Sequence, residues 1–155
     1  MAWTKLSSVS LTSDATSLDS DSFEGYKSLW VQIFLPKAVA YLRFNDDGSA
    51  VYNRKRSEDG GSWSQSLGIN ELRLDRNSSE TQWINCWIVN VNGVEKFGIL
   101  QTISNNANGA SNAPKRQEYI FKFTPTALIT KVNLLYSGST NLASGTELNV
   151  YGDND

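Results

Sequence analysis

Carboxylates are the main groups in this sequence that could carry out chemistry, because it contains no histidine and a single cysteine, Cys86. The lack of histidine excludes serine or cysteine triads with an imidazole base, most zinc sites and the usual proton shuttle. Cys86 lies inside the apolar run WINCWIV, where a small buried hydrophobic residue is a better interpretation than a nucleophile or a ligand. Paired-carboxylate hydrolysis and calcium binding are the chemistries that remain.

Neither remaining chemistry is well supported by the positions of the acidic residues. A glycosidase needs two acids across a cleft. The acidic residues here lie mostly in expected turns, where an acid is common because water solvates its charge. They include Asp14, Asp19, Asp21, Asp46, Asp47, Glu58 and Asp59. The stretch Asn45-Asp46-Asp47-Gly48-Ser49 could begin a calcium loop, but it lacks the spacing and the terminal glutamate of an EF-hand. We therefore predict a protein that is not an enzyme and that holds no metal or cofactor.

The charge distribution argues against nucleic acid and membrane partners. The formal net charge is −2, and the only basic clusters are Arg54-Lys55-Arg56 and Lys115-Arg116. Adjacent residues of a strand face opposite sides, so the triplet cannot form one flat patch. We interpret it as a solvated strand edge that discourages aggregation, with docking onto an acidic protein surface as the alternative. No apolar window approaches a membrane span, and the N-terminus lacks a signal-peptide core, so we expect a soluble, unexported chain.

Runs with a period of two residues recur about every ten residues and predict an all-β protein. Asn92-Gly93 predicts a type I′ hairpin turn, and Asn45 to Gly48 predicts a hairpin connection into 49–56. The Ser/Thr/Asp-rich segment 10–22 is expected to be a flexible loop or arm, and 104–114 a surface loop. Ten runs are candidate strands, together with a short segment near Trp63, and we expect eight or nine strands in total: 2–9, 26–35, 38–45, 49–56, 71–74, 81–91, 94–103, 117–124, 128–136 and 146–151.

These strands must close on themselves or stack as two sheets, because one open sheet would expose an apolar face and long edges. We predict a single domain over 1–155, built as an antiparallel, jelly-roll-like β-sandwich. An immunoglobulin-like sandwich and a small barrel are the alternatives.

Two of the expected strands carry aromatic side chains opposite their aliphatic residues. Since a sandwich has one core side per sheet, one of these faces must meet a second layer, a covering loop, another subunit or a ligand. Tyr and Trp are enriched at subunit interfaces, but Trp63, Trp83 or Trp87 could instead stack on a sugar. The candidate interface residues are Tyr26, Trp30, Phe34, Trp83 and Trp87.

The segment 128–152, LITKVNLLYSGSTNLASGTELNVYG, resembles the C-terminal segment of many small virion proteins of tailed bacteriophages. In those proteins an alternating strand is followed by a Gly/Ser/Asn turn, a small-residue step and a closing strand. Here the step is Ala143-Ser144-Gly145, and the closing signature is Leu148, Val150, Tyr151 and Gly152. The rest of the chain is similar only in its strand rhythm and in its aromatic strand opening FEGYKSLWVQI.

The resemblance implies a virion structural protein, above all a capsid decoration or cement protein assembled in the host cytoplasm. Its partners would be the major capsid protein or other virion proteins, together with neighbouring copies of itself as a homo-oligomer on the particle. The alternative is a receptor-binding or carbohydrate-binding, lectin-like tail module. The chain departs from the pattern at Asp153-Asn154-Asp155, where similar proteins often stop after a hydrophobic residue.

Overall fold

A computed structural model describes residues 2–37, 39–74, 80–105, 111–136 and 141–155. Within these residues the chain contains strands and no helix, and every strand pairing is antiparallel. The predicted all-β antiparallel sandwich is therefore confirmed. The number of strands was underestimated, since the described part of the chain forms twelve.

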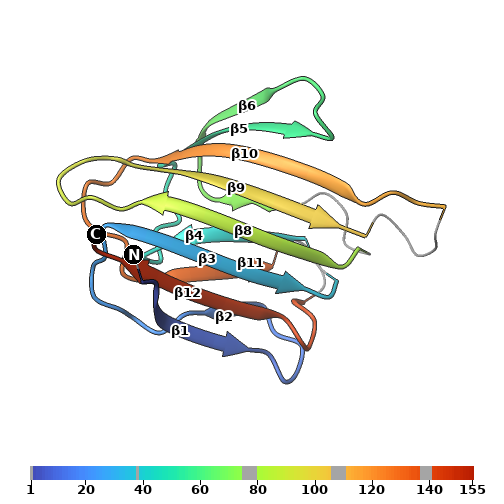
Figure 1. The fold of residues 1–155 in the computed structure, drawn as a ribbon, viewed down its shortest axis with the longest axis horizontal. Coiled ribbons are helices and arrows are strands. Elements are labelled where there is room, and N and C mark those ends of the chain that lie inside the picture. Colours follow the sequence, from blue (N-terminus) through green and yellow to red (C-terminus); the bar gives the residue numbers. More distant parts are fainter. Residues whose placement is uncertain (1, 38, 75–79, 106–110, 137–140) are drawn as a thin grey trace.

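The strands form two sheets that lie one behind the other (Figure 1). In spatial order the eight-stranded sheet contains β1 (Thr4–Ser10), β12 (Glu147–Asp153), β3 (Ser28–Leu35), β8 (Gln82–Val89), β9 (Lys96–Ser104), β10 (Lys115–Phe123), β5 (Tyr52–Glu58) and β6 (Ser64–Ile69). The four-stranded sheet contains β2 (Ser17–Asp19), β11 (Val132–Tyr136), β4 (Ala40–Phe44) and β7 (Leu72–Arg73). From β1 to β5 the chain alternates between the two sheets.

The core lies between the two sheets and follows the alternation of the sequence. In β3 the residues Leu29, Val31, Ile33 and Leu35 are fully buried, while the residues between them are partly exposed. This is the pattern of a strand with one face on the core. An aromatic cluster extends the core under β10 and β5, and it contains Phe44, Tyr52, Phe121 and Phe123.

The closing strand is placed as its pattern predicts. Gly145 has a φ of 84°, which a side chain would disfavour, and the turn there leads into β12. Thr146, Leu148 and Val150 are fully buried on the core side. β12 lies in the interior of the eight-stranded sheet, paired with β1 on one side and β3 on the other.

The predicted hairpin at Asn45 to Gly48 is wrong. β4 and β5, which flank it, belong to different sheets. Asn45 instead fastens this crossing to the segment before β11: its side-chain amide donates to Leu128 O (2.8 Å), and its oxygen accepts from Thr130 N (2.9 Å). Asn45 and Asp46 have φ values of 55° and 59°, so both adopt the left-handed conformation that Asn and Asp tolerate.

The hairpin around Asn92-Gly93 is confirmed as a pairing of β8 with β9, but its turn type is wrong. The strands stop at Val89 and resume at Lys96, so the connection is longer than two residues. A type I′ turn requires a positive φ at both central residues. Gly93 has a φ of 83°, but Asn92 is not among the described residues with a positive φ.

Hydrogen bonds to the segments before β3 and before β11 accompany the longer connection. The Asn90 amide donates to Tyr26 O (2.8 Å) and Ile129 O (3.1 Å), and its oxygen accepts from Ile129 N (2.8 Å). Gly93 N donates to Thr126 O (2.9 Å). The loop therefore satisfies its polar groups on the segment before β11 rather than across its own turn.

The segment 10–22 is not a free arm, as its composition had suggested. Its first residue ends β1, and it contains β2, which pairs with β11. Leu11 N donates to Thr146 O (2.9 Å), and Ala15 forms an isolated bridge with Leu142. It lies along the sandwich. The predicted surface loop at 104–114 falls partly outside the described residues.

Candidate binding face

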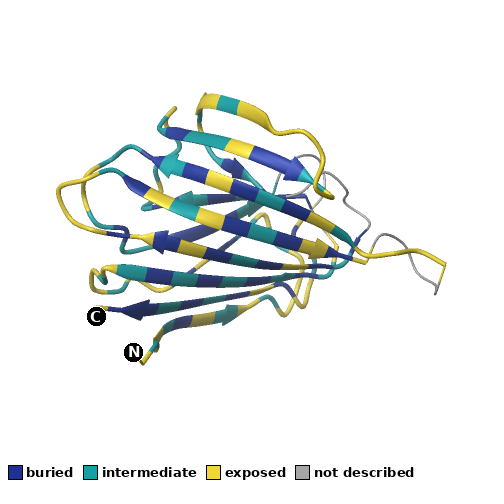
Figure 2. Cartoon of the chain, turned by 45° about the horizontal axis from the view of Figure 1, so that its top comes forward, coloured by how far each residue is buried: buried dark blue, intermediate teal, exposed yellow. Residues whose placement is uncertain are grey.

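The outward face is defined here as the side of the eight-stranded sheet that points away from the four-stranded sheet. Four of the five candidate interface residues lie on it: Trp30 and Phe34 from β3, and Trp83 and Trp87 from β8. Tyr26 does not, because its ring packs with Leu6 in the space that a side chain at position 152 would occupy. Figure 2 shows the alternation of exposed and buried residues along the central strands.

Strand pairing arranges the outward side chains in rows across the sheet. The first apolar row is Tyr151, Trp30, Trp87, Ile99 and Ile120, in register on the five adjacent strands from β12 to β10. The rings of Trp30 and Trp87 are stacked, with centroids 6.3 Å apart and planes 7° apart. Tyr151 lies 5.2 Å from Trp30. Directly opposed aromatic and β-branched pairs of this kind stabilise a sheet.

The second apolar row lies toward the other end of the strands. It contains Phe34, Trp83 and Ile103, again in register, and the Phe34 and Trp83 centroids are 6.4 Å apart. Trp83 and Ile103 are exposed, at 40% and 51%. The two apolar rows are separated by four residues along each strand, which is about 13 Å.

Side-chain amides occupy the row between the two apolar rows. This amide row contains Asn149, Gln32, Asn85 and Gln101, in register on β12, β3, β8 and β9. Asn85 Oδ1 accepts a hydrogen bond from Trp30 Nε1 at 3.1 Å. The amide row is neutral and offers donors and acceptors together.

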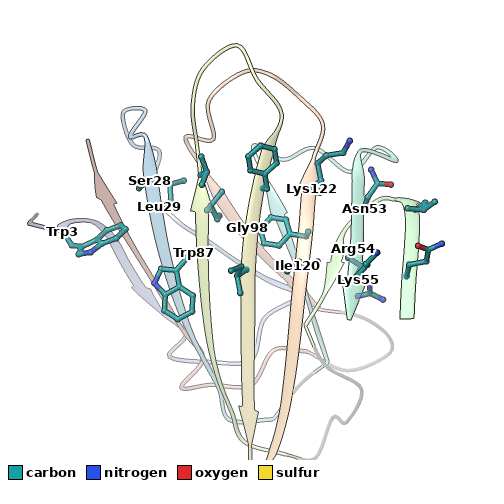
Figure 3. Close-up of a pocket in the computed structure, with 17 residues that line it drawn as sticks. Trp3, Ser28, Leu29, Asn53, Arg54, Lys55, Trp87, Gly98, Ile120 and Lys122 are labelled. Atoms are coloured by element: carbon teal, nitrogen blue, oxygen red, sulfur yellow. The ribbon is translucent and has the colours of Figure 1, made fainter. Parts of the chain in front are cut away.

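A hollow of about 730 Å³ lies over Trp87, Ile99 and Ile120 of the first apolar row (Figure 3). Trp3 lines one side of it and lies over β3, where its ring packs edge-on against Trp30 at 5.9 Å between centroids. Leu67 of the edge strand β6 lines the other side. The outward face is thus hollowed between these two sides.

Gly98 forms part of the floor of the hollow. On its core side, the space for a side chain is already taken: an added Cβ would lie 2.4 Å from the Phe121 ring and 2.6 Å from the carbonyl oxygen of Trp87. The ring of Phe121 thus fills the position that a side chain at 98 would hold.

Two lysines mark one side of the hollow. Lys55 on β5 and Lys122 on β10 line it opposite Trp3 and Trp87, as Figure 3 shows. Lys122 Nζ pairs with Glu95 at 2.9 Å, with both side chains more than two-fifths exposed. Such a surface pair contributes little to stability, so these cations remain accessible to a partner.

The rest of the basic triplet serves the fold. Arg54 Nη1 donates to Arg73 O (3.0 Å), and its guanidinium lies over the Tyr119 ring, so burial lowers the pKa of Arg54. Arg56 is buried. The prediction that the triplet is a strand edge is wrong, because β5 pairs with β10 on one side and β6 on the other.

The carboxylate of Asp46, which the sequence offered for calcium, is bound by a lysine instead. Lys131 Nζ donates to both carboxylate oxygens of Asp46 (3.0 and 3.1 Å), and Asn133 adds a third bond (2.7 Å). The hydrogen bond from Lys131 is the main reason that the pKa of Asp46 lies below its usual value. Among the described residues, no group of three or more His, Cys, Asp or Glu side chains is placed to hold a metal ion.

Cys86 and Glu80 have structural roles. Cys86 is completely buried, and burial raises the pKa of its thiol, so the thiolate is disfavoured. Glu80 is a buried acid that the sequence did not single out: it accepts from Ser104 Oγ (2.6 Å) and Lys115 Nζ (3.1 Å) and ties β9 to β10. Trp63 lies in the β5–β6 connection, beyond either apolar row.

Comparisons with known proteins add no family. Neither a scan against protein-family models nor a search of curated proteins found a match to this chain. In the described part of the chain, no helix has the length and hydrophobicity that crossing a bilayer requires. The interpretation of the outward face therefore rests on its own geometry.

Proposed function

We propose that this protein is a structural component of a tailed-bacteriophage particle, a decoration or cement protein that binds neighbouring virion proteins through its outward face. The observation that carries the proposal is the exposed apolar surface over adjacent central strands. Trp87, Phe97, Ile99 and Ile120 are each 39–51% exposed there. An apolar surface of this extent typically marks an interaction site. The resemblance of 128–152 to phage virion proteins supplies the kind of assembly.

The dimensions of the face suit a protein partner. The six strands from β12 to β5 span about 24 Å, and eight residues of strand span about 26 Å, which together give about 620 Å². A standard protein interface buries about 800 Å² on each partner. The outward residues of β3, β8 and β9 carry no charge, and aromatic residues without charges are typical of the centre of an interface.

Reconstitution on particles tests the proposal. Purified protein, added to particles that lack it, should rebind at defined lattice positions visible by cryo-electron microscopy. Ile99→Asp should abolish rebinding, because it puts a charge in the centre of the face. Val91→Asp is the matched control, since Val91 is 41% exposed but lies in the β8–β9 loop. Absence of the protein from purified virions, or rebinding by the Ile99→Asp variant, would overturn the proposal.

A carbohydrate-binding module is the second candidate, and the amide row favours it. Aromatic rings bind the faces of sugars, and amides bind their hydroxyl groups; here Asn85 and Gln101 lie between Trp87 and Trp83. On this candidate a glycan array should give hits that Trp83→Ala and Gln101→Ala each remove. An array without hits would reject the carbohydrate candidate and leave the protein interface as the remaining proposal.

A further inference from the structure

The hollow over the first apolar row carries an inference about the partner, and it rests on the proposed function because it names the chemistry of what docks there. We infer that the hollow receives a convex, apolar segment of a different protein, and that this segment carries acidic side chains on the flank that faces β5. The inference follows from the shape, the charge and the extent of the outward face.

The shape of the hollow excludes a two-fold dimer through this face. In such a dimer the same patch would oppose itself. Because the hollow lies between Trp3 on one side and Leu67 on the other, the dimer would set hollow against hollow and touch only at the rims. The apolar floor around Ile99 would stay uncovered. The occupant must therefore be convex and different from this face.

The charges around the hollow indicate which flank of the docked segment should be acidic. Lys55 and Lys122 lie on one side of the hollow, and none of the described residues that line it is acidic; the Glu95 carboxylate, which pairs with Lys122 at 2.9 Å, lies outside this lining. Trp3 and Trp87, on the opposite side, are uncharged. A chain with a net charge of −2 thus presents a local positive side here. A segment with Asp or Glu on its β5 flank and apolar residues elsewhere matches this distribution.

The extent of the face favours a polypeptide over a small amphiphile. The hollow by itself has the volume of a ligand pocket. However, exposed apolar side chains recur beyond the amide row, at Trp83 and Ile103 in the second apolar row, about 13 Å further along the strands. A fatty acid in the hollow would leave that row exposed, whereas a polypeptide can cover both rows. A groove that takes an apolar segment is a recurring mode of peptide recognition.

Selection from a library of random peptides tests the inference without knowledge of the natural partner. The immobilised full chain should enrich peptides that combine apolar residues with Asp or Glu. Ile99→Asp should abolish their binding, which is followed by tryptophan fluorescence. The double variant Lys55→Glu/Lys122→Glu should bind the same peptides about tenfold more weakly and should itself enrich peptides with Lys or Arg. Lys37→Glu is the control and should leave binding unchanged, because Lys37 is an exposed lysine in the connection after β3 and does not line the hollow.

Each other outcome overturns the inference. These outcomes are no enriched peptide, enrichment without acidic residues, unchanged binding by the lysine double variant, saturable binding of sodium dodecanoate that displaces the peptides, and concentration-dependent dimerisation that Ile99→Asp abolishes. The result is separable from the proposed function. If the protein selects acidic apolar peptides but is absent from virions, the inference about the hollow stands and the proposed virion function fails. If the protein is present in virions but selects no such peptides, the proposed function stands and the inference about the hollow fails.

Discussion

Adding one methyl group at Gly98 should destabilise the protein, because the space for it is already filled. In Gly98→Ala the new Cβ would lie 2.4 Å from the Phe121 ring and 2.6 Å from the Trp87 carbonyl oxygen. The ring can tilt, but the backbone carbonyl belongs to a paired strand of the sheet interior. Overpacking of this kind costs about 1–3 kcal/mol. Replacing a strand glycine with alanine returns about 0.5–1 kcal/mol. Because the backbone contact places the overpacking cost in the upper half of its range, the net loss should be about 1–2 kcal/mol.

Urea unfolding followed by tryptophan fluorescence, together with calorimetry, measures this loss. For a chain of this size the expected fall in Tm is about 2–8 °C. The double variant Gly98→Ala/Phe121→Leu removes ring atoms from the clash. Its cost should be smaller than the sum of the two single costs by about 1 kcal/mol. A Gly98→Ala variant as stable as the parent, or strictly additive costs, would refute the idea that Phe121 fills the place of a side chain at 98.

Three further predictions concern the core, the long hairpin and the crossing between sheets. Val150→Asp puts a carboxylate at a fully buried position, so it should abolish the cooperative melt seen by circular dichroism; a soluble, cooperatively melting variant would contradict the assigned face. Asn90→Ala leaves three backbone groups without their amide partner and should cost about 2–4 kcal/mol by urea unfolding, against less than about 0.5 kcal/mol for the loop neighbour Asn92→Ala; equal losses would count against the anchoring role. Lys131 holds the pKa of Asp46 below 3.8, so the pair contributes stability above that pH and loses it as the pH falls through the lowered pKa. Asp46→Asn should therefore flatten the acid limb of a stability profile measured by urea midpoints, and an unchanged limb would show that the pair does not contribute.

The strand faces could be predicted from the sequence because a period of two residues leaves only two choices. The aliphatic row of β3 and the row of Leu148 and Val150 in β12 are buried as expected, and Trp83 and Trp87 face outward. The fold class follows from the same pattern, since many short strands with one apolar face must stack.

Sheet membership could not be predicted, because a turn sequence encodes local conformation and not the partner of the next strand. Asn45-Asp46 does adopt positive φ values, yet the chain crosses to the other sheet there. At Asn92-Gly93 the hydrogen bonds of Asn90 to the segments before β3 and before β11 outweigh the preference of the pair for a two-residue turn. Long-range polar contacts decided both cases.

The candidate site was predicted only in part for the same reason. Trp30 and Trp87 are visible as outward residues on single strands, but a row depends on the register between strands. The run KFGILQTI already places Phe97 and Ile99 on one face, and that signal was available. The amide row, the hollow and its two lysines appear only when five or more strands are aligned.

The position of β12 has a consequence for how the protein is made. This strand joins β1 to β3, although it is synthesised long after both. A growing chain therefore carries two unpaired strand edges, with the core faces of β1 and β3 open to water, until the segment 147–153 has left the ribosome. Pairings between such distant segments form slowly, and exposed edges invite pairing with other chains. Synthesis of this protein should thus depend on chaperones or on a high folding rate once β12 has emerged, and chains cut short before β12 should aggregate rather than fold.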